Sequence, residues 1–202
     1  MSPYLIFGLA MVGIVIFSLV VTGNLAATFN ERAKKDMKAA LEPLAEQLEG
    51  SVDVESARVE GRYHGQITTG QVVSGPGGMG RLFETTFVEP AGGSPWKAVV
   101  RRPKTVEQEW ERTFDSSADF ASEFQQSIFA LLDALLPYPG WFEIAYEPVA
   151  GSLKLTRAMQ SRRDVPSPER FRAYLESLER GAAANRSVQG DAVAGAGAGT
   201  AS

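Results

Sequence analysis

The sequence predicts an α+β fold: a single N-terminal transmembrane helix followed by an antiparallel β-sheet covered by helices. Three observations lead to this prediction. A long uncharged segment opens the chain, apolar residues then recur at every second position in several short segments, and two later segments have the three- and four-residue spacing of a helix. We expect about five to seven short strands, since the connections between them are short.

Changes in composition divide the chain into four parts. We assign residues 1–29 to a transmembrane anchor, 30–50 to a juxtamembrane helix, 51–180 to an α+β domain and 181–202 to a disordered tail rich in Ala and Gly. The central part is long enough to bury a core of its own.

Charge and cysteine content exclude several classes of function. The 202 residues carry a net charge of −4, whereas nucleic-acid-binding domains are usually basic. The sequence contains no Cys, which excludes disulfides, thiol catalysis and Cys-ligated metals. We therefore expect no nucleic-acid partner and no cofactor.

The N-terminal segment predicts a membrane anchor that is not cleaved. No charged side chain occurs from Pro3 to Phe29. At about 1.5 Å per residue, this is long enough for a helix to cross a hydrocarbon core of about 30 Å. A cleaved signal peptide is the alternative, but the positive start that such a peptide needs is missing and the apolar run is too long.

Four basic residues directly after the anchor predict its orientation: Arg32, Lys34, Lys35 and Lys38. Basic residues beside a span tend to stay in the cytoplasm, so we expect the N-terminus outside and the domain in the cytoplasm. Long domains are sometimes exported despite such charges, which keeps the opposite orientation open. The same residues attract anionic lipid.

The juxtamembrane segment reads as an amphipathic helix. Met37, Leu41, Leu44 and Leu48 form one apolar stripe over residues 31–49. Pro43 lies inside the pattern, so we expect a kink or a new helix near Leu41.

Alternation predicts strands at residues 56–63, 67–73, 82–88, 97–102, 142–147 and 152–156. His64-Gly65 forms the first turn, and Pro148–Gly151 connects the last two strands. Residues 75–80 match G-x-G-x-x-G, but a strand follows them where a dinucleotide site needs a helix. We therefore interpret them as a hairpin loop.

Two helical segments complete the domain. The first, over residues 120–136, carries a stripe of six apolar residues, with Ser116, Ser117 or Asp119 as its cap: Phe120, Phe124, Ile128, Leu131, Leu132 and Leu135. The last helix has Ser167 as N-cap, Pro168 at its first position and Glu169 in its first turn.

Candidate site residues are few. His64 is the only histidine and has no nucleophile motif or acidic neighbour in sequence. Glu107, Glu109 and Glu111 alternate around Trp110, which is typical of an exposed edge strand or a solvated helix face. A second basic group is either a solvated surface or a contact for a partner: Arg157, Arg162, Arg163, Arg170 and Arg172.

The function that these observations favour is a single-pass, membrane-anchored, non-enzymatic domain that binds a partner protein as an accessory or assembly subunit. The alternative is a domain that holds a lipid or small amphiphile between the sheet and helix 120–136. A pocket of several hundred Å³ under that helix would favour the alternative, and a closed core would exclude it.

Overall fold

The computed structural model describes residues 3–78, 80–101, 110–135, 141–159, 161 and 164–197. It consists of two parts, Met1–Ala39 and Ala40–Ser202. The long helix α1, Pro3–Gln47, begins in the first part and ends in the second. The segments predicted as anchor and juxtamembrane helix are therefore one helix.

In the first part, α1 exposes its apolar side chains. Phe17 and Leu19 are 70% and 68% exposed. Among the described residues, this is the one helix that is long and apolar enough to span a membrane by length and composition, and none of its most apolar window is buried. An apolar surface of this kind is unfavourable in water, and its length matches a bilayer.

In the second part, the end of α1 belongs to the core. Leu41, Leu44 and Leu48, which form the predicted stripe, are completely buried. Of the two expectations for Pro43, a kink or a new helix near Leu41, the new helix is wrong, because α1 continues through Pro43 to Gln47. Proline removes one backbone donor, and the carbonyl left without it belongs to the exposed Ala39, where water can replace that donor.

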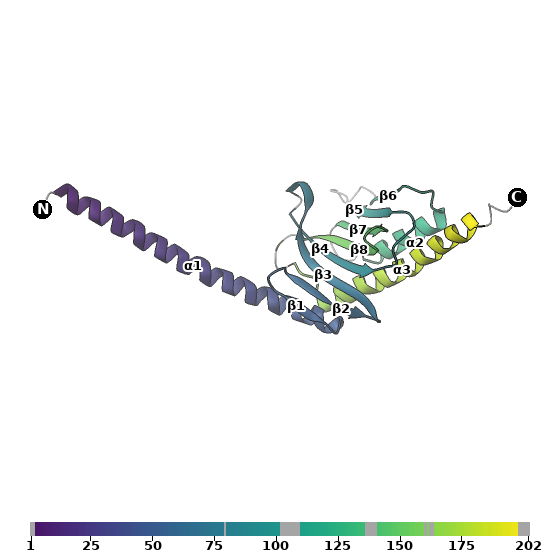
Figure 1. Cartoon of the computed structure of the whole chain (residues 1–202), viewed down its shortest axis with the longest axis horizontal. Coiled ribbons are helices and arrows are strands. Elements are labelled where there is room, and N and C mark those ends of the chain that lie inside the picture. The colour runs from purple at the N-terminus through teal and green to yellow at the C-terminus, as the bar shows by residue number, and fades with distance from the viewer. Residues whose placement is uncertain are drawn as a thin grey trace. The chain divides into compact units, whose positions relative to one another are not determined.

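The fold class is confirmed as α+β, with eight antiparallel strands in one sheet (Figure 1). Their spatial order is β1-β2-β3-β4-β8-β7-β5-β6. The strands are β1 Ser51–Asp53, β2 Arg58–Tyr63, β3 Gln66–Ser74, β4 Arg81–Val88, β5 Trp96–Arg101, β6 Glu111–Ser116, β7 Trp141–Glu147 and β8 Ser152–Met159. A short 3₁₀ turn, η1 Pro76–Gly78, lies in the predicted hairpin loop between β3 and β4.

The two strands that the sequence did not predict lie at the ends of this order. β1 has only three residues, and β6 is polar with one half-buried apolar residue, Phe114. Neither carries the alternation of a half-buried strand. The turn between β2 and β3 is as predicted, because His64 and Gly65 both have positive φ, at 48° and 82°, as a two-residue hairpin requires.

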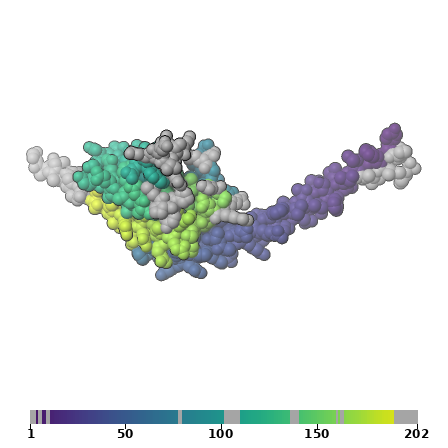
Figure 2. All heavy atoms as spheres, turned by 180° about the vertical axis from the view of Figure 1, so that it is seen from behind, coloured from purple at the N-terminus to yellow at the C-terminus, as the bar shows by residue number. Residues whose placement is uncertain are grey.

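Two further helices, α2 Ser122–Asp133 and α3 Pro168–Gly197, cover one face of the sheet together with the end of α1. Phe124 of α2 lies on Trp96, with ring centroids 5.3 Å apart. Phe171 of α3 lies on Gly70, where an added Cβ would be 3.2 Å from its ring. Figure 2 shows α2 in teal and α3 in yellow-green side by side on this face.

The helix starts agree only partly with the predictions. Ser167 caps α3 by accepting a hydrogen bond from the backbone N–H of Arg170 at 3.4 Å. This start lowers the pKa of Glu169 through its hydrogen bonds to its own backbone N–H and to Ser167. In contrast, α2 begins after Ala121 without a side-chain cap, because Ser116 ends β6 and bonds Ala118 instead.

The C-terminal segment differs from the predicted disordered tail. Helix α3 continues to Gly197, and Ala182 and Asn185 are 0% and 2% exposed. Gly181 explains this packing: with no side chain, it lets the helix lie directly on the sheet, where an added Cβ would be 3.1 Å from Ile144. Gly181, Ala182 and Asn185, in the segment that resembled a low-complexity tail, are thus buried residues of a packed helix. Residues 198–202 lie outside the described part.

Candidate functional site: the open face of the sheet

Strand alternation gives the sheet two very different faces. Phe83, Phe87, Phe142 and Leu155 point to the helices and are at most 1% exposed. Their neighbours along each strand point the other way, to a face on which no described helix lies. We call this second surface the open face.

The register of the strands arranges the open face in rows across the sheet. One row, which we call the lysine row, contains Ser51, Glu60, Thr69, Thr86, Lys154, Ala145, Lys97 and Asp115. The next, which we call the glutamate row, contains Asp53, Arg58, Gln71, Glu84, Thr156, Glu143, Val99 and Thr113. Each strand contributes one residue to each row, two positions apart.

The glutamate row holds a carboxylate in an unfavourable environment. Burial raises the pKa of Glu143; Lys97 and Lys154 oppose this shift, while Glu84 and Glu147 add to it. Lys154 itself is bound to another carboxylate, since its Nζ lies 3.1 Å from both oxygens of Glu147. The face therefore contains a partly desolvated acid that a further cation would stabilise.

Among the described residues, a hollow opens near each end of this face. The hollow on β5–β7 has a volume of about 420 Å³ and is lined by Lys97, Asp115 and Glu143 among others. The hollow on β1–β3 has a volume of about 560 Å³ and is lined by Arg58, Glu60 and Thr69 among others. Each hollow combines charged side chains with apolar lining surface.

The open face also exposes apolar side chains. Ile67 and Val88 are 49% and 50% exposed, and they lie on the paired strands β3 and β4. Val99 and Trp141 are half-buried on the same face. The open face thus combines exposed apolar side chains with charged ones.

In contrast, side chains fill the space between α2 and the sheet. Phe124, Ile128 and Leu132 are at most 5% exposed. Phe124 packs against Trp96 and also against Phe114 and Phe120, with centroids 6.1 and 5.1 Å apart. Neither hollow of the open face is lined by a residue of α2.

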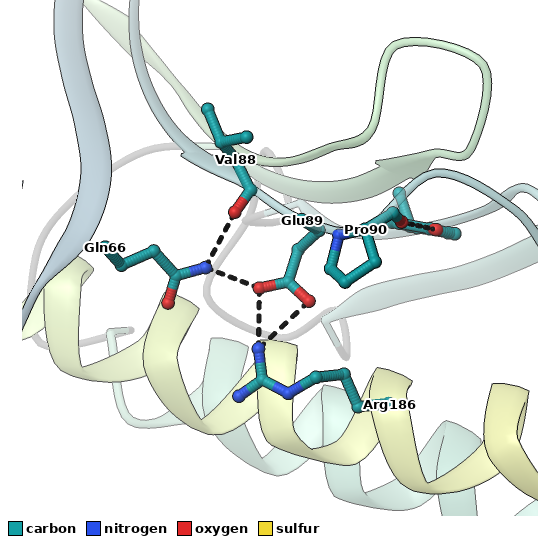
Figure 3. A network of polar contacts seen from close by, with 6 residues as sticks. Gln66, Val88, Glu89, Pro90 and Arg186 are labelled. Carbon is teal, nitrogen blue, oxygen red and sulfur yellow. Dashed lines mark hydrogen bonds and ion pairs between the residues drawn. The ribbon is translucent and has the colours of Figure 1, made fainter.

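A polar network fixes the loop after β4 to α3 (Figure 3). The Glu89 carboxylate, completely buried, accepts hydrogen bonds from Arg186 at 2.8 and 3.0 Å and from Gln66 at 2.5 Å. Asn185 accepts a bond from the indole of Trp96 at 2.8 Å. A cavity of about 250 Å³ lies beside these residues. Because each of these polar groups already has a partner within the chain, we interpret the network as structural.

The four basic residues predicted beside the membrane lie on α1 in the first part of the structure. Arg32, Lys35 and Lys38 are exposed, and Lys34 is half-buried. They follow the exposed apolar segment within about three turns of the helix. Their spacing is thus compatible with contacts to lipid headgroups.

The second basic group is not one surface. Arg157 is 2% exposed, because alternation in β8 turns it toward the helices, where it pairs with Asp164 at 2.7 Å. Arg157 is therefore not available to a partner, contrary to the sequence prediction. Arg170 is half-buried and Arg172 exposed on the first turns of α3; Arg162 and Arg163 lie outside the described residues.

The other candidates have ordinary structural roles. His64 stacks on Tyr63 at 4.1 Å, and its Nδ1 lies 2.9 Å from Glu179 on α3. Glu111 begins the edge strand β6, as one of the two interpretations expected, whereas Glu107 and Glu109 lie outside the described residues. Lys97, Glu143 and Lys154 were not singled out in the sequence. Each lies on the polar side of a different predicted strand, and the register of the sheet brings the three onto one face.

The described residues include no group of three or more His, Asp and Glu residues that could hold a metal ion. Comparison with models of protein families, with curated proteins and with solved structures yields no match for this chain.

Proposed function

We propose that this protein is a single-pass, membrane-anchored, non-enzymatic domain that binds another protein at the membrane through the open face of its sheet. The observation that carries the proposal is the contrast between the two faces: α2, α3 and the end of α1 cover one, and no described element covers the other. A sheet face with exposed Ile67 and Val88 and with paired charges suits a protein partner.

The anchor supports the membrane location. Its apolar residues are exposed along a helix of sufficient length, and the basic residues from Arg32 to Lys38 follow directly. By the positive-inside tendency, the N-terminus lies outside the membrane and the domain lies in the cytoplasm.

The lipid-binding alternative has less support. It requires space between the sheet and α2, where Phe124, Ile128 and Leu132 fill the interface. The hollows on the open face are lined largely by charged and hydroxyl side chains, which do not suit an acyl chain.

Photo-cross-linking in native membranes tests the proposal. A photoreactive amino acid replaces Thr69 or Val99 on the open face of the full-length chain, and Glu176 on the exposed side of α3 serves as control. We expect protein adducts from the first two positions and few from the third. Equal yields at all three positions, or adducts with lipid alone, would contradict the proposal.

A further inference from the structure

The open face is large enough for a stable protein interface. Eight strands spaced about 4.8 Å apart give a width of about 35–40 Å. Four rows, the lysine row, the glutamate row and one row beyond each on the central strands, are separated by about 7 Å along the strands and give a depth of about 20 Å. The resulting area of about 700–800 Å² per chain is that of a standard protein–protein interface.

The lysine and glutamate rows of this face are related to each other in a simple way. Each residue of the lysine row has, two positions away on the same strand, a residue of the glutamate row. A 180° rotation about an axis that runs across the strands, between the two rows, therefore places each row of one chain over the other row of a second copy. The strands of the two copies then face each other one to one.

We propose that the partner of the open face is the open face of a second copy of this chain, joined to it by such a two-fold axis. This inference rests on the proposed function, since it names the protein that the open face binds. The interface is isologous, so every contact occurs twice.

Charge complementarity supports this arrangement. Lys154 would lie over Thr156 of the second copy, whose neighbours in the sheet are Glu84 and Glu143. Lys97 would lie over Val99, beside that same Glu143. At the β2 end, Glu60 would lie over Arg58, and nowhere in the two rows does one charge directly face a like charge.

The centre of the interface carries most of this complementarity. Packed sheets cross at about 30°, so contacts are closest where the axis meets the middle of the face. That middle is formed by β4 and β8, which carry Glu84 and Lys154. A Lys from the second copy would also add a further cation beside the half-buried Glu143.

Membrane anchoring would assist this association. Both copies would share one membrane plane, which raises their local concentration, as a tether does. The net charge of −4 on each chain opposes association at long range, but salt screens it.

Cysteine cross-linking of the full chain in membranes tests the proposal. Because the sequence has no Cys, each introduced cysteine is the single thiol of its chain. Thr86→Cys and Ala145→Cys lie on the lysine row, and Glu176→Cys on α3 is the control. With a short bismaleimide we expect a covalent dimer of the chain from the first two variants and little from the third. Equal yields from all three variants would overturn the proposal. It would also be overturned if the thiols of Thr86→Cys and Ala145→Cys react with a maleimide label but give no covalent dimer.

A charge exchange distinguishes the interface from effects on folding. In a Thr86→Cys background, Lys154→Glu and Glu84→Lys should each lower the yield of dimer about tenfold, because like charges then meet across the axis. When differently tagged chains carrying one change each are mixed, the carboxylate introduced into one chain meets the ammonium introduced into the other. The mixed dimer should therefore recover, and no recovery on mixing would overturn the proposal.

The outcomes also separate this inference from the proposed function. Adducts of the open face with a different protein, without dimers of the chain, would refute the two-fold dimer and leave protein binding in place. If neither cysteine nor photo-cross-linking gives a protein adduct at the open face, both proposals fail.

Discussion

Arg186, in the second half of α3, donates two hydrogen bonds from Nη1 to the carboxylate of Glu89, at 2.8 and 3.0 Å. The Glu89 side chain is completely buried, whereas Arg186 is 49% exposed. Two neighbours continue the connection: Asn185 accepts a hydrogen bond from Trp96, and Gln189 exchanges two with the backbone of Ser94. The end of α3 thus holds the loop that leads from β4 to β5.

Loss of this ion pair should destabilise the domain. Arg186→Ala leaves a buried carboxylate without its cation, which we expect to lower the free energy of unfolding by about 2–4 kcal/mol. Denaturant melts of the full chain in detergent measure the change. Arg180→Ala, an exposed arginine on the same helix, is the matched control and should cost less than about 0.5 kcal/mol. Equal effects of the two substitutions would show that the Glu89 contact contributes little.

The packing of α2 on the sheet predicts different stability losses for alanine substitutions at two adjacent leucines. Leu132 is completely buried, and Leu132→Ala should cost about 2–5 kcal/mol through lost burial and a cavity. Leu131 is half-buried beside Gly181, so Leu131→Ala should cost clearly less. Thermal or denaturant melts of the two variants measure both losses in stability. A larger loss for Leu131→Ala than for Leu132→Ala would contradict this packing of α2 on the sheet.

The pKa of Glu143 predicts a dependence of stability on pH. Burial raises this pKa above its usual value of 4.5, so the folded protein binds the proton more tightly than the unfolded chain. The stabilisation by the protonated form is complete when the pH is below the unfolded pKa of 4.5, and it is lost as the pH rises through the raised pKa. Glu143→Gln removes this loss, so the variant should gain stability relative to wild type as the pH rises from about 4 to about 7. A stability difference between the variant and wild type that stays constant across that pH range would contradict the prediction.

The orientation of the anchor predicts which side of the membrane carries the domain. Protease added to intact cells should leave a C-terminal tag uncut, and permeabilisation should expose it, since basic residues beside a span tend to stay in the cytoplasm. Replacing Arg32, Lys34, Lys35 and Lys38 with Gln should increase the fraction of chains in the opposite orientation. Cleavage of the wild-type tag on intact cells would contradict this orientation and place the domain outside.

The sequence by itself determined the elements that depend on local patterns. The apolar anchor, the stripe of Leu41, Leu44 and Leu48, the His64-Gly65 turn and the cap at Ser167 all follow from spacing or from residue type. Each of these signals comes from residues within two or three turns of one another, so no distant contact is needed to read it.

The tertiary structure decided the features that depend on distant partners. Strand β6 forms because β5 supplies its hydrogen bonds, although five of its six residues are polar. The Ala- and Gly-rich end of α3 is ordered because Gly181 fits against Ile144 and because Arg186 meets Glu89, 97 residues earlier. Arg157 lies inside because β8 turns that side of the strand to the helices. Burial and pairing across the sheet outweigh local propensity at these positions, because a residue's neighbours in space, and not those in sequence, set its free energy.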